Sequence, residues 1–130
     1  SYNDAQLIRF RVIALMGDNQ LKLAKKQALK LVSLSNKVEN YLLVADVYRK
    51  EKKFNTAVRY LESAYIKNYN EKLLDEISII LYVDLGKKKE AIAQLETHSM
   101  TYGCSKLICN RLLSFYADLN DSVVYYQHKK

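Results

Sequence analysis

Few side chains in this sequence of 130 residues could carry out chemistry. The only histidines are His98 and His128, and neither belongs to an H-E-x-x-H motif or to a cluster with the spacing of metal ligands. No serine occupies a G-x-S-x-G turn, and Gly17, Gly86 and Gly103 lie too far apart to form a phosphate-binding loop. We therefore expect no catalytic residues, no metal site and no cofactor, and we predict that the chain is not an enzyme.

Cys104 and Cys109 form the one unusual local pattern. If Ser105 is the N-cap of a helix, the cysteines occupy the residue before the cap and the fourth helical position, which meet in a hydrophobic staple. A disulfide is then geometrically feasible, and the chain-entropy model gives so short a loop about 2 kcal/mol. The alternative is two free thiols that pack as small apolar side chains, whereas zinc lacks further ligands. A bonded pair favours an extracytoplasmic compartment (the bacterial periplasm or secretion), and free thiols favour the cytoplasm.

Composition places the chain among single globular domains. Hydrophobic residues make up 49% and charged residues 27%, so the chain can bury a core. The absence of proline and the presence of only three glycines exclude a β-sandwich or barrel, which needs many turns. No apolar run reaches the roughly 18 residues of a membrane span. The chain begins with Ser1 and has no signal-peptide pattern, which indicates a fragment of a longer or processed protein.

An internal repeat gives the strongest indication of the fold. Tyr48, Tyr82 and Tyr116 are spaced by 34 residues. The same spacing relates Ala57 to Ala91, Val58 to Ile92, and Leu61 to Leu95. Within each period the apolar residues follow helical spacing in two segments, separated by a charged turn. The sequence therefore predicts antiparallel helix pairs, with Gly86 and, in the first unit, Gly17 at the turns.

This pattern resembles the tetratricopeptide repeat (TPR), a helix–turn–helix module of 34 residues. The match is best in YLLVADVYRKEKKFNTAVRYLESAY, where the family positions are held by Tyr41, Ala45, Tyr48, Phe54, Ala57, Leu61 and Ala64. Departures include Ile79 and Leu113 at small positions and His98 at an alanine position. The resemblance implies an all-α, right-handed superhelical solenoid of about eight helices in a single domain, 1–130. Its units are about 4–37, 38–70, 71–104 and 105–130, the last with a shortened turn at LNDSVV.

In TPR proteins the first helices of successive units line a concave groove that commonly binds an extended peptide or a helix. The corresponding residues here are Leu42, Asp46, Arg49, Lys50, Glu76, Ile80, Val83, Asn110 and Ser114. Leu42 and Asp46 stand where the carboxylate-clamp version has Lys and Asn, so recognition of a chaperone C-terminus is not expected. The resemblance implies a non-catalytic scaffold that binds a protein partner within a larger assembly. Alternatively, these residues pack on further repeats of a longer chain.

A second surface follows from charge. The chain has 21 basic and 14 acidic residues, a net charge of +7. The turns of two successive units carry clustered lysines: Lys50, Lys52 and Lys53, then Lys87, Lys88 and Lys89. This lysine ridge is either a solvated edge or a binding site for an acidic protein or an anionic surface. The alternative function is therefore a binder of an anionic surface or nucleic acid through the ridge. Nucleic acid is disfavoured, because its sites pair arginines with exposed aromatic rings.

Overall fold

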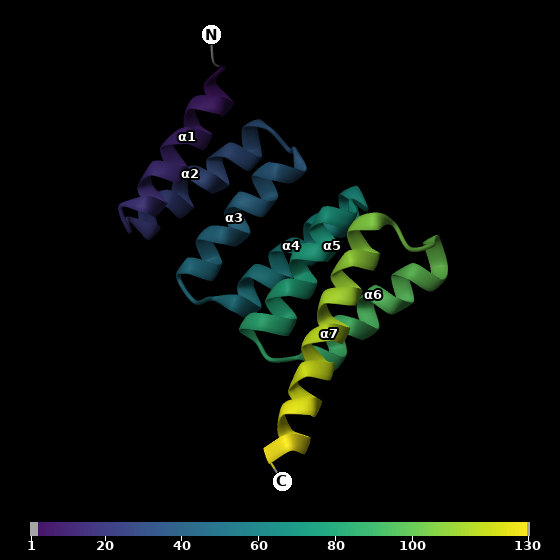
Figure 1. Ribbon diagram of the computed structural model, residues 1–130. Coiled ribbons are helices and arrows are strands. Elements are labelled where there is room, and N and C mark those ends of the chain that lie inside the picture. The colour runs from purple at the N-terminus through teal and green to yellow at the C-terminus, as the bar shows by residue number, and fades with distance from the viewer. Residues whose placement is uncertain (1–2, 130) are drawn as a thin grey trace.

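The computed structural model describes residues 3–129, with the side chains of residues 3–120. Its elements are α1 (Asp4–Gly17), α2 (Leu21–Leu34), α3 (Val38–Lys50), α4 (Phe54–Asn68), α5 (Glu71–Ile79), the π-helical η1 (Ile80–Asp84), α6 (Lys88–Tyr102) and α7 (Lys106–Lys129). The described residues contain no strand. Figure 1 shows the helices stacked as antiparallel pairs along the chain. The predicted all-α solenoid is therefore confirmed.

The stacking places the first helix of each pair beside the first helix of the next. Each helix packs on its neighbour in sequence, from α1 on α2 to α6 on α7. In addition, α3 contacts α5 and α5 contacts α7. The first helices α3, α5 and α7 thus lie side by side and share one face of the molecule.

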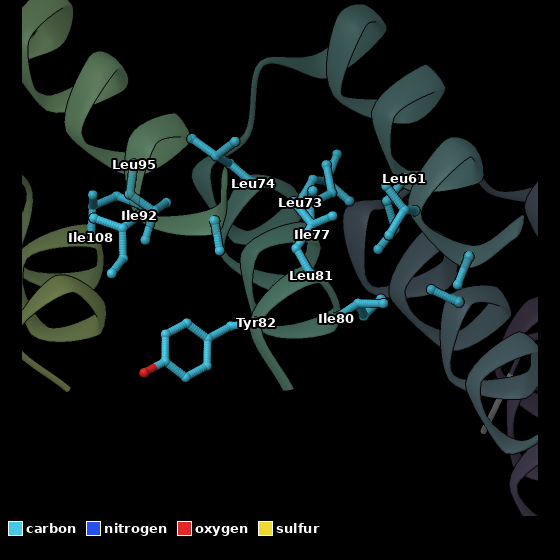
Figure 2. Close-up of a cluster of buried hydrophobic side chains, with 14 of the residues drawn as sticks. Leu61, Leu73, Leu74, Ile77, Ile80, Leu81, Tyr82, Ile92, Leu95 and Ile108 are labelled. Carbon is cyan, nitrogen blue, oxygen red and sulfur yellow. The ribbon is translucent and has the colours of Figure 1, made fainter. Parts of the chain in front are cut away.

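The core is built from the repeated apolar positions. Ala57, Leu61, Ala91 and Leu95 are fully buried, as their spacing predicted. Figure 2 shows Leu61 of α4 opposite the apolar side chains of α5, among them Ile77. Because alanine has no bulk beyond Cβ, it lets paired helices approach closely, which explains its place at the repeated positions.

The turn inside each helix pair needs one residue in the left-handed backbone region. The structure places Asn19 (φ 58°), Lys52 (φ 61°) and Gly86 (φ 68°) there. Glycine adopts this conformation without strain and asparagine tolerates it, whereas the Cβ atom of a lysine makes the conformation sterically unfavourable. The prediction is confirmed for Gly86 and wrong for Gly17, which is the last residue of α1.

The last helix differs from the expected fourth unit. The backbone of α7 stays helical from Lys106 to Lys129, through the LNDSVV segment in which a turn was expected. That expectation was wrong. No glycine or proline occurs within α7 to end the helix.

Candidate functional site

Three arginines join neighbouring first helices across their common face. Arg9 reaches from α1 to α3, Arg49 from α3 to α5 and η1, and Arg111 from α7 back to α5. Arg9 donates to the side-chain oxygen of Asn40 at 3.0 Å and to the carbonyl oxygen of Glu39 at 3.3 Å. These bridges set the spacing of the first helices. Pattern reasoning from the sequence missed the roles of Arg9 and Arg111, because they depend on how the helices are placed in space.

Arg49 is the central bridge. Its guanidinium donates to Asp84 Oδ2 at 2.7 Å and to Glu76 Oε1 at 3.1 Å. Burial works against the charged guanidinium, but the hydrogen bond and charge of Asp84 raise the pKa of Arg49. Burial also raises the pKa of Glu76, with a further contribution from the nearby carboxylate of Asp46. The structure thus brings together Arg49, Asp46 and Glu76, all predicted groove residues, and adds Asp84.

Arg111 holds a buried carboxylate. Its Nε donates to Asp75 Oδ1 at 2.8 Å and its Nη2 to Asp75 Oδ2 at 3.2 Å. The Asp75 side chain is 11% exposed and that of Arg111 is 32% exposed. A paired guanidinium with two parallel bonds is the arrangement that best compensates a buried carboxylate. This pair therefore locks α7 against α5.

The predicted groove residues fall into three groups by exposure. Lys50, Val83, Asn110 and Ser114 are exposed, Leu42, Asp46, Arg49 and Glu76 are half-buried, and Ile80 is fully buried. The assignment of Ile80 to the groove surface was therefore wrong. The N–H of Leu85 bonds to the carbonyl of Ile80, a π-helical turn that holds one residue more than an α-helical turn. Figure 2 shows Ile80 within the core cluster.

Two hollows open beside these residues. One, of about 410 Å³, is lined by Met16, Asp46, Arg49, Lys50, Lys52, Phe54 and Asp84. The other, of about 510 Å³, is lined by Lys106, Leu107, Asn110 and Arg111 at the start of α7. Asp46 makes no hydrogen bond within the described chain, and burial raises its pKa. The hollows combine apolar walls with polar groups, as a protein-binding surface requires.

The lysine ridge lies at the turns and at the start of α6. Lys50, Lys52, Lys87 and Lys89 are exposed. Lys53 lies 3.7 Å from Glu51, and Lys88 lies 3.7 Å from Asp118. The ammonium of Lys88 also sits 5.2 Å from the centre of the Tyr82 ring. Two of the six lysines thus have acidic partners within the protein.

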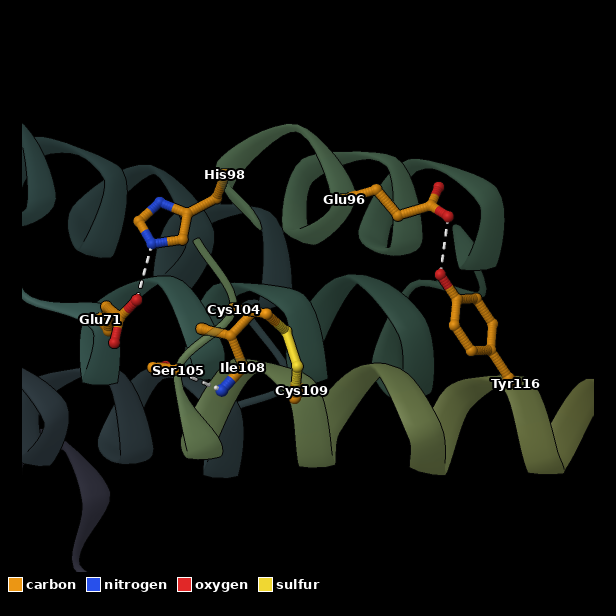
Figure 3. Close-up of a disulfide and its surroundings, with 8 residues drawn as sticks. All are labelled: Glu71, Glu96, His98, Cys104, Ser105, Ile108, Cys109 and Tyr116. Carbon is orange, nitrogen blue, oxygen red and sulfur yellow. Dashed lines mark hydrogen bonds and ion pairs between the residues drawn. A yellow bond between two sulfur atoms is a disulfide. The ribbon is translucent and has the colours of Figure 1, made fainter. Parts of the chain in front are cut away.

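His98 is held in a polar cluster between helices. Its Nε2 lies 2.7 Å from Glu71 Oε2 and its Nδ1 lies 3.4 Å from the hydroxyl of Tyr65 (Figure 3 shows the contact with Glu71). Hydrogen bonds from His98 and Ser105 lower the pKa of Glu71. The cluster ties α4, α5 and α6 together, which is a structural role. The side chain of His128 lies outside the described residues.

The structure joins Cys104 to Cys109 by a disulfide, with a Cα–Cα distance of 5.5 Å (Figure 3). The hydroxyl of Ser105 accepts a hydrogen bond from the N–H of Ile108 at 3.3 Å, so Ser105 is the N-cap of α7. Cys104 therefore precedes the cap and Cys109 lies in the first turns of the helix. The compartment expected from a bonded pair stays a prediction.

The described residues form neither a metal-binding cluster nor a helix that could span a membrane. No three His, Cys, Asp or Glu side chains among them lie close enough to hold a metal ion. Nor is any helix, within the same part of the chain, both long and apolar enough to cross a membrane.

Comparison with known proteins identifies the fold. No family model matches the sequence, and no curated protein matches it. The structure is similar to the crystal structure of the Sgt2 TPR domain from Aspergillus fumigatus, with a TM-score of 0.67 and 14% sequence identity. The match covers 93% of this chain and 82% of that one. The chain therefore has a TPR-like fold.

Proposed function

We propose that this protein is a non-catalytic scaffold whose first-helix groove binds a peptide or helix of a partner protein. The observation that carries the proposal is Val83, an apolar side chain that is 64% exposed on η1, next to the Arg49–Asp84 ion pair. Burial of the exposed apolar side chain would contribute binding energy, and the charged groups of the neighbouring ion pair would orient the ligand.

The arginine bridges support this proposal because they hold the groove in one shape. Arg9, Arg49 and Arg111 each connect two first helices, so the side chains between them keep their relative positions without a ligand. A preformed surface loses less conformational entropy on binding. Leu42, Val83 and Asn110, from three successive first helices, are the residues that we expect a ligand to contact.

The lysine ridge is the competing site. Its exposed lysines from two neighbouring turns would attract an acidic protein or an anionic surface. Such attraction weakens steeply with salt, because exposed charges are screened. Binding through Val83 and its neighbours depends on apolar burial and responds much less to salt. That this protein acts as a scaffold within a larger assembly stays a prediction.

The test begins with peptides selected from a displayed random library on the immobilised protein. The affinity of a selected peptide is then measured for the wild type, Val83→Asp and the triple variant Lys87→Glu, Lys88→Glu, Lys89→Glu. The matched control is Met100→Asp, which changes an 81% exposed apolar residue on α6. We expect a loss of at least about tenfold only in Val83→Asp, which corresponds to about 1.4 kcal/mol. Loss confined to the triple variant would assign binding to the ridge and reject the groove.

A further inference from the structure

The outer face of α1 carries exposed apolar side chains around one arginine, Arg11, although it lies at the end of the helix stack. Leu7 is 46% exposed, and Ala14 on the same side is also exposed. The opposite side of α1 carries Ile8 and Val12, which are buried against α2 and α3. A helix with a single packed side is expected to be polar on its outer side. The face therefore has the composition of a packing surface.

The repeat itself shows what covers this face elsewhere in the molecule. α1 and α5 both follow an asparagine N-cap, Asn3 and Asn70, and their pairs turn at left-handed Asn19 and Gly86. Asn3 and Asn70 are 67 residues apart, and so are Asn19 and Gly86. In this alignment Leu7 corresponds to Leu74, Phe10 to Ile77 and Ala14 to Leu81.

These equivalents on α5 are all buried. Leu74, Ile77 and Leu81 belong to the core cluster that α5 forms with the preceding helix, α4. On α3 the equivalents, 33 residues further on, are Asn40, Leu43 and Val47, and all three are buried, the last two in the cluster with α1 and α2. The same positions are thus covered by the preceding helix on α3 and on α5.

We propose that the Leu7–Ala14 face of α1 binds a further helix pair of this repeat type, whose second helix packs antiparallel on α1 as α4 packs on α5. The occupying helix must also compensate the positive charge of Arg11. Arg11 is exposed on this face, at the position that Ser78 holds, fully buried, on α5. The occupying helix therefore carries a carboxylate opposite Arg11, because a covered and unpaired guanidinium would be strongly unfavourable. Such a pair lengthens the first-helix groove by one unit.

The experiment uses a fused protein in which a copy of residues 38–69 precedes Asn3. This junction reproduces the native order of Tyr69, an asparagine cap and an acidic first helical residue. The fused and unfused proteins both carry Arg11→Ser, which removes the need for a carboxylate. Leu7→Asp in α1 is then compared with the control Leu29→Asp, a 41% exposed leucine whose equivalents Glu62 and Glu96 are exposed acids.

We expect Leu7→Asp to lower the urea midpoint of the fused protein clearly while leaving that of the unfused protein unchanged. Leu29→Asp should have no effect on either. Amide exchange in α1 should slow at least tenfold on fusion, which is a readout that does not depend on the variants. Equal effects of Leu7→Asp in both proteins, with unchanged exchange, would overturn the proposal. Dimerisation of the unfused wild type that Leu7→Asp abolishes would also overturn it, in favour of a second copy.

Discussion

The pair between Arg111 and Asp75 gives the sharpest prediction about stability. Arg111→Met keeps most of the aliphatic length of the side chain and removes the guanidinium. Asp75 then keeps its charge in a site where only 11% of its side chain is exposed. The carboxylate also loses both of its hydrogen bonds to Arg111, at 2.8 and 3.2 Å.

The magnitude follows from the burial of the two partners. Breaking a fully buried pair costs about 3–5 kcal/mol, because the remaining charge is left without compensation. The Arg111 side chain is 32% exposed, so water can reach the carboxylate once the guanidinium is gone. We therefore expect Arg111→Met to lower the free energy of unfolding by about 2–3 kcal/mol.

The assay is urea unfolding followed by circular dichroism, with the double variant Arg111→Met, Asp75→Asn as the comparison. An amide in place of the carboxylate removes the buried charge, so the double variant should be more stable than Arg111→Met alone. A loss below about 0.5 kcal/mol in the single variant would mean that the pair is only a surface contact. A double variant less stable than the single one would refute the argument from the buried charge.

Four further predictions concern a packing site, a turn, a carboxylate and the disulfide. Ala57→Leu should lower the free energy of unfolding by about 1–3 kcal/mol in a denaturant titration through overpacking of a fully buried site, and a neutral result would contradict the close helix approach. Gly86→Ala should cost about 1 kcal/mol in the same titration because of its left-handed backbone (φ 68°), whereas an equal cost for Gly17→Ala would contradict this. The hydrogen bonds that lower the pKa of Glu71 stabilise the fold above its ordinary pKa of 4.5 and are lost as pH falls through the lowered value. Glu71→Gln should therefore differ from the wild type more at pH 6 than at pH 3 in thermal melts, and a constant difference would reject the link. Finally, mass spectrometry after thiol blocking of native material should find no alkylated Cys104 or Cys109 before reduction, and two modified thiols would contradict the disulfide.

The helix pairs could be predicted because their cause is local. The 34-residue spacing of tyrosines, alanines and leucines reflects positions that every pair must bury, and Ala57, Leu61, Ala91 and Leu95 are indeed buried. The left-handed turn positions were only partly predictable. Glycine indicates such a position at Gly86, and the 34-residue spacing places Lys52 at the equivalent position, although a lysine by itself gives no sign of a left-handed backbone.

The groove was harder to predict because it depends on contacts between helices. Ile80 holds a groove position by alignment, yet it lies one helical turn after the buried Ile77 and is itself fully buried in the core. Asp75 is buried although it is an acid, and its pairing with Arg111 on α7, which compensates the charge, cannot be read from the spacing of residues along the chain. Assigning groove positions by alignment with the repeat family identifies the correct helices, but it does not predict how far each side chain is buried.

The measurement that tests the proposed groove most directly is an NMR titration of the isotope-labelled protein with a library-selected peptide. We expect the largest amide shifts at Leu42, Val83 and Asn110, with little change at Lys52 and Lys89. These shifts should persist when salt is raised, because apolar burial is not screened. Shifts concentrated at Lys52 and Lys89 that vanish at high salt would contradict binding in the groove.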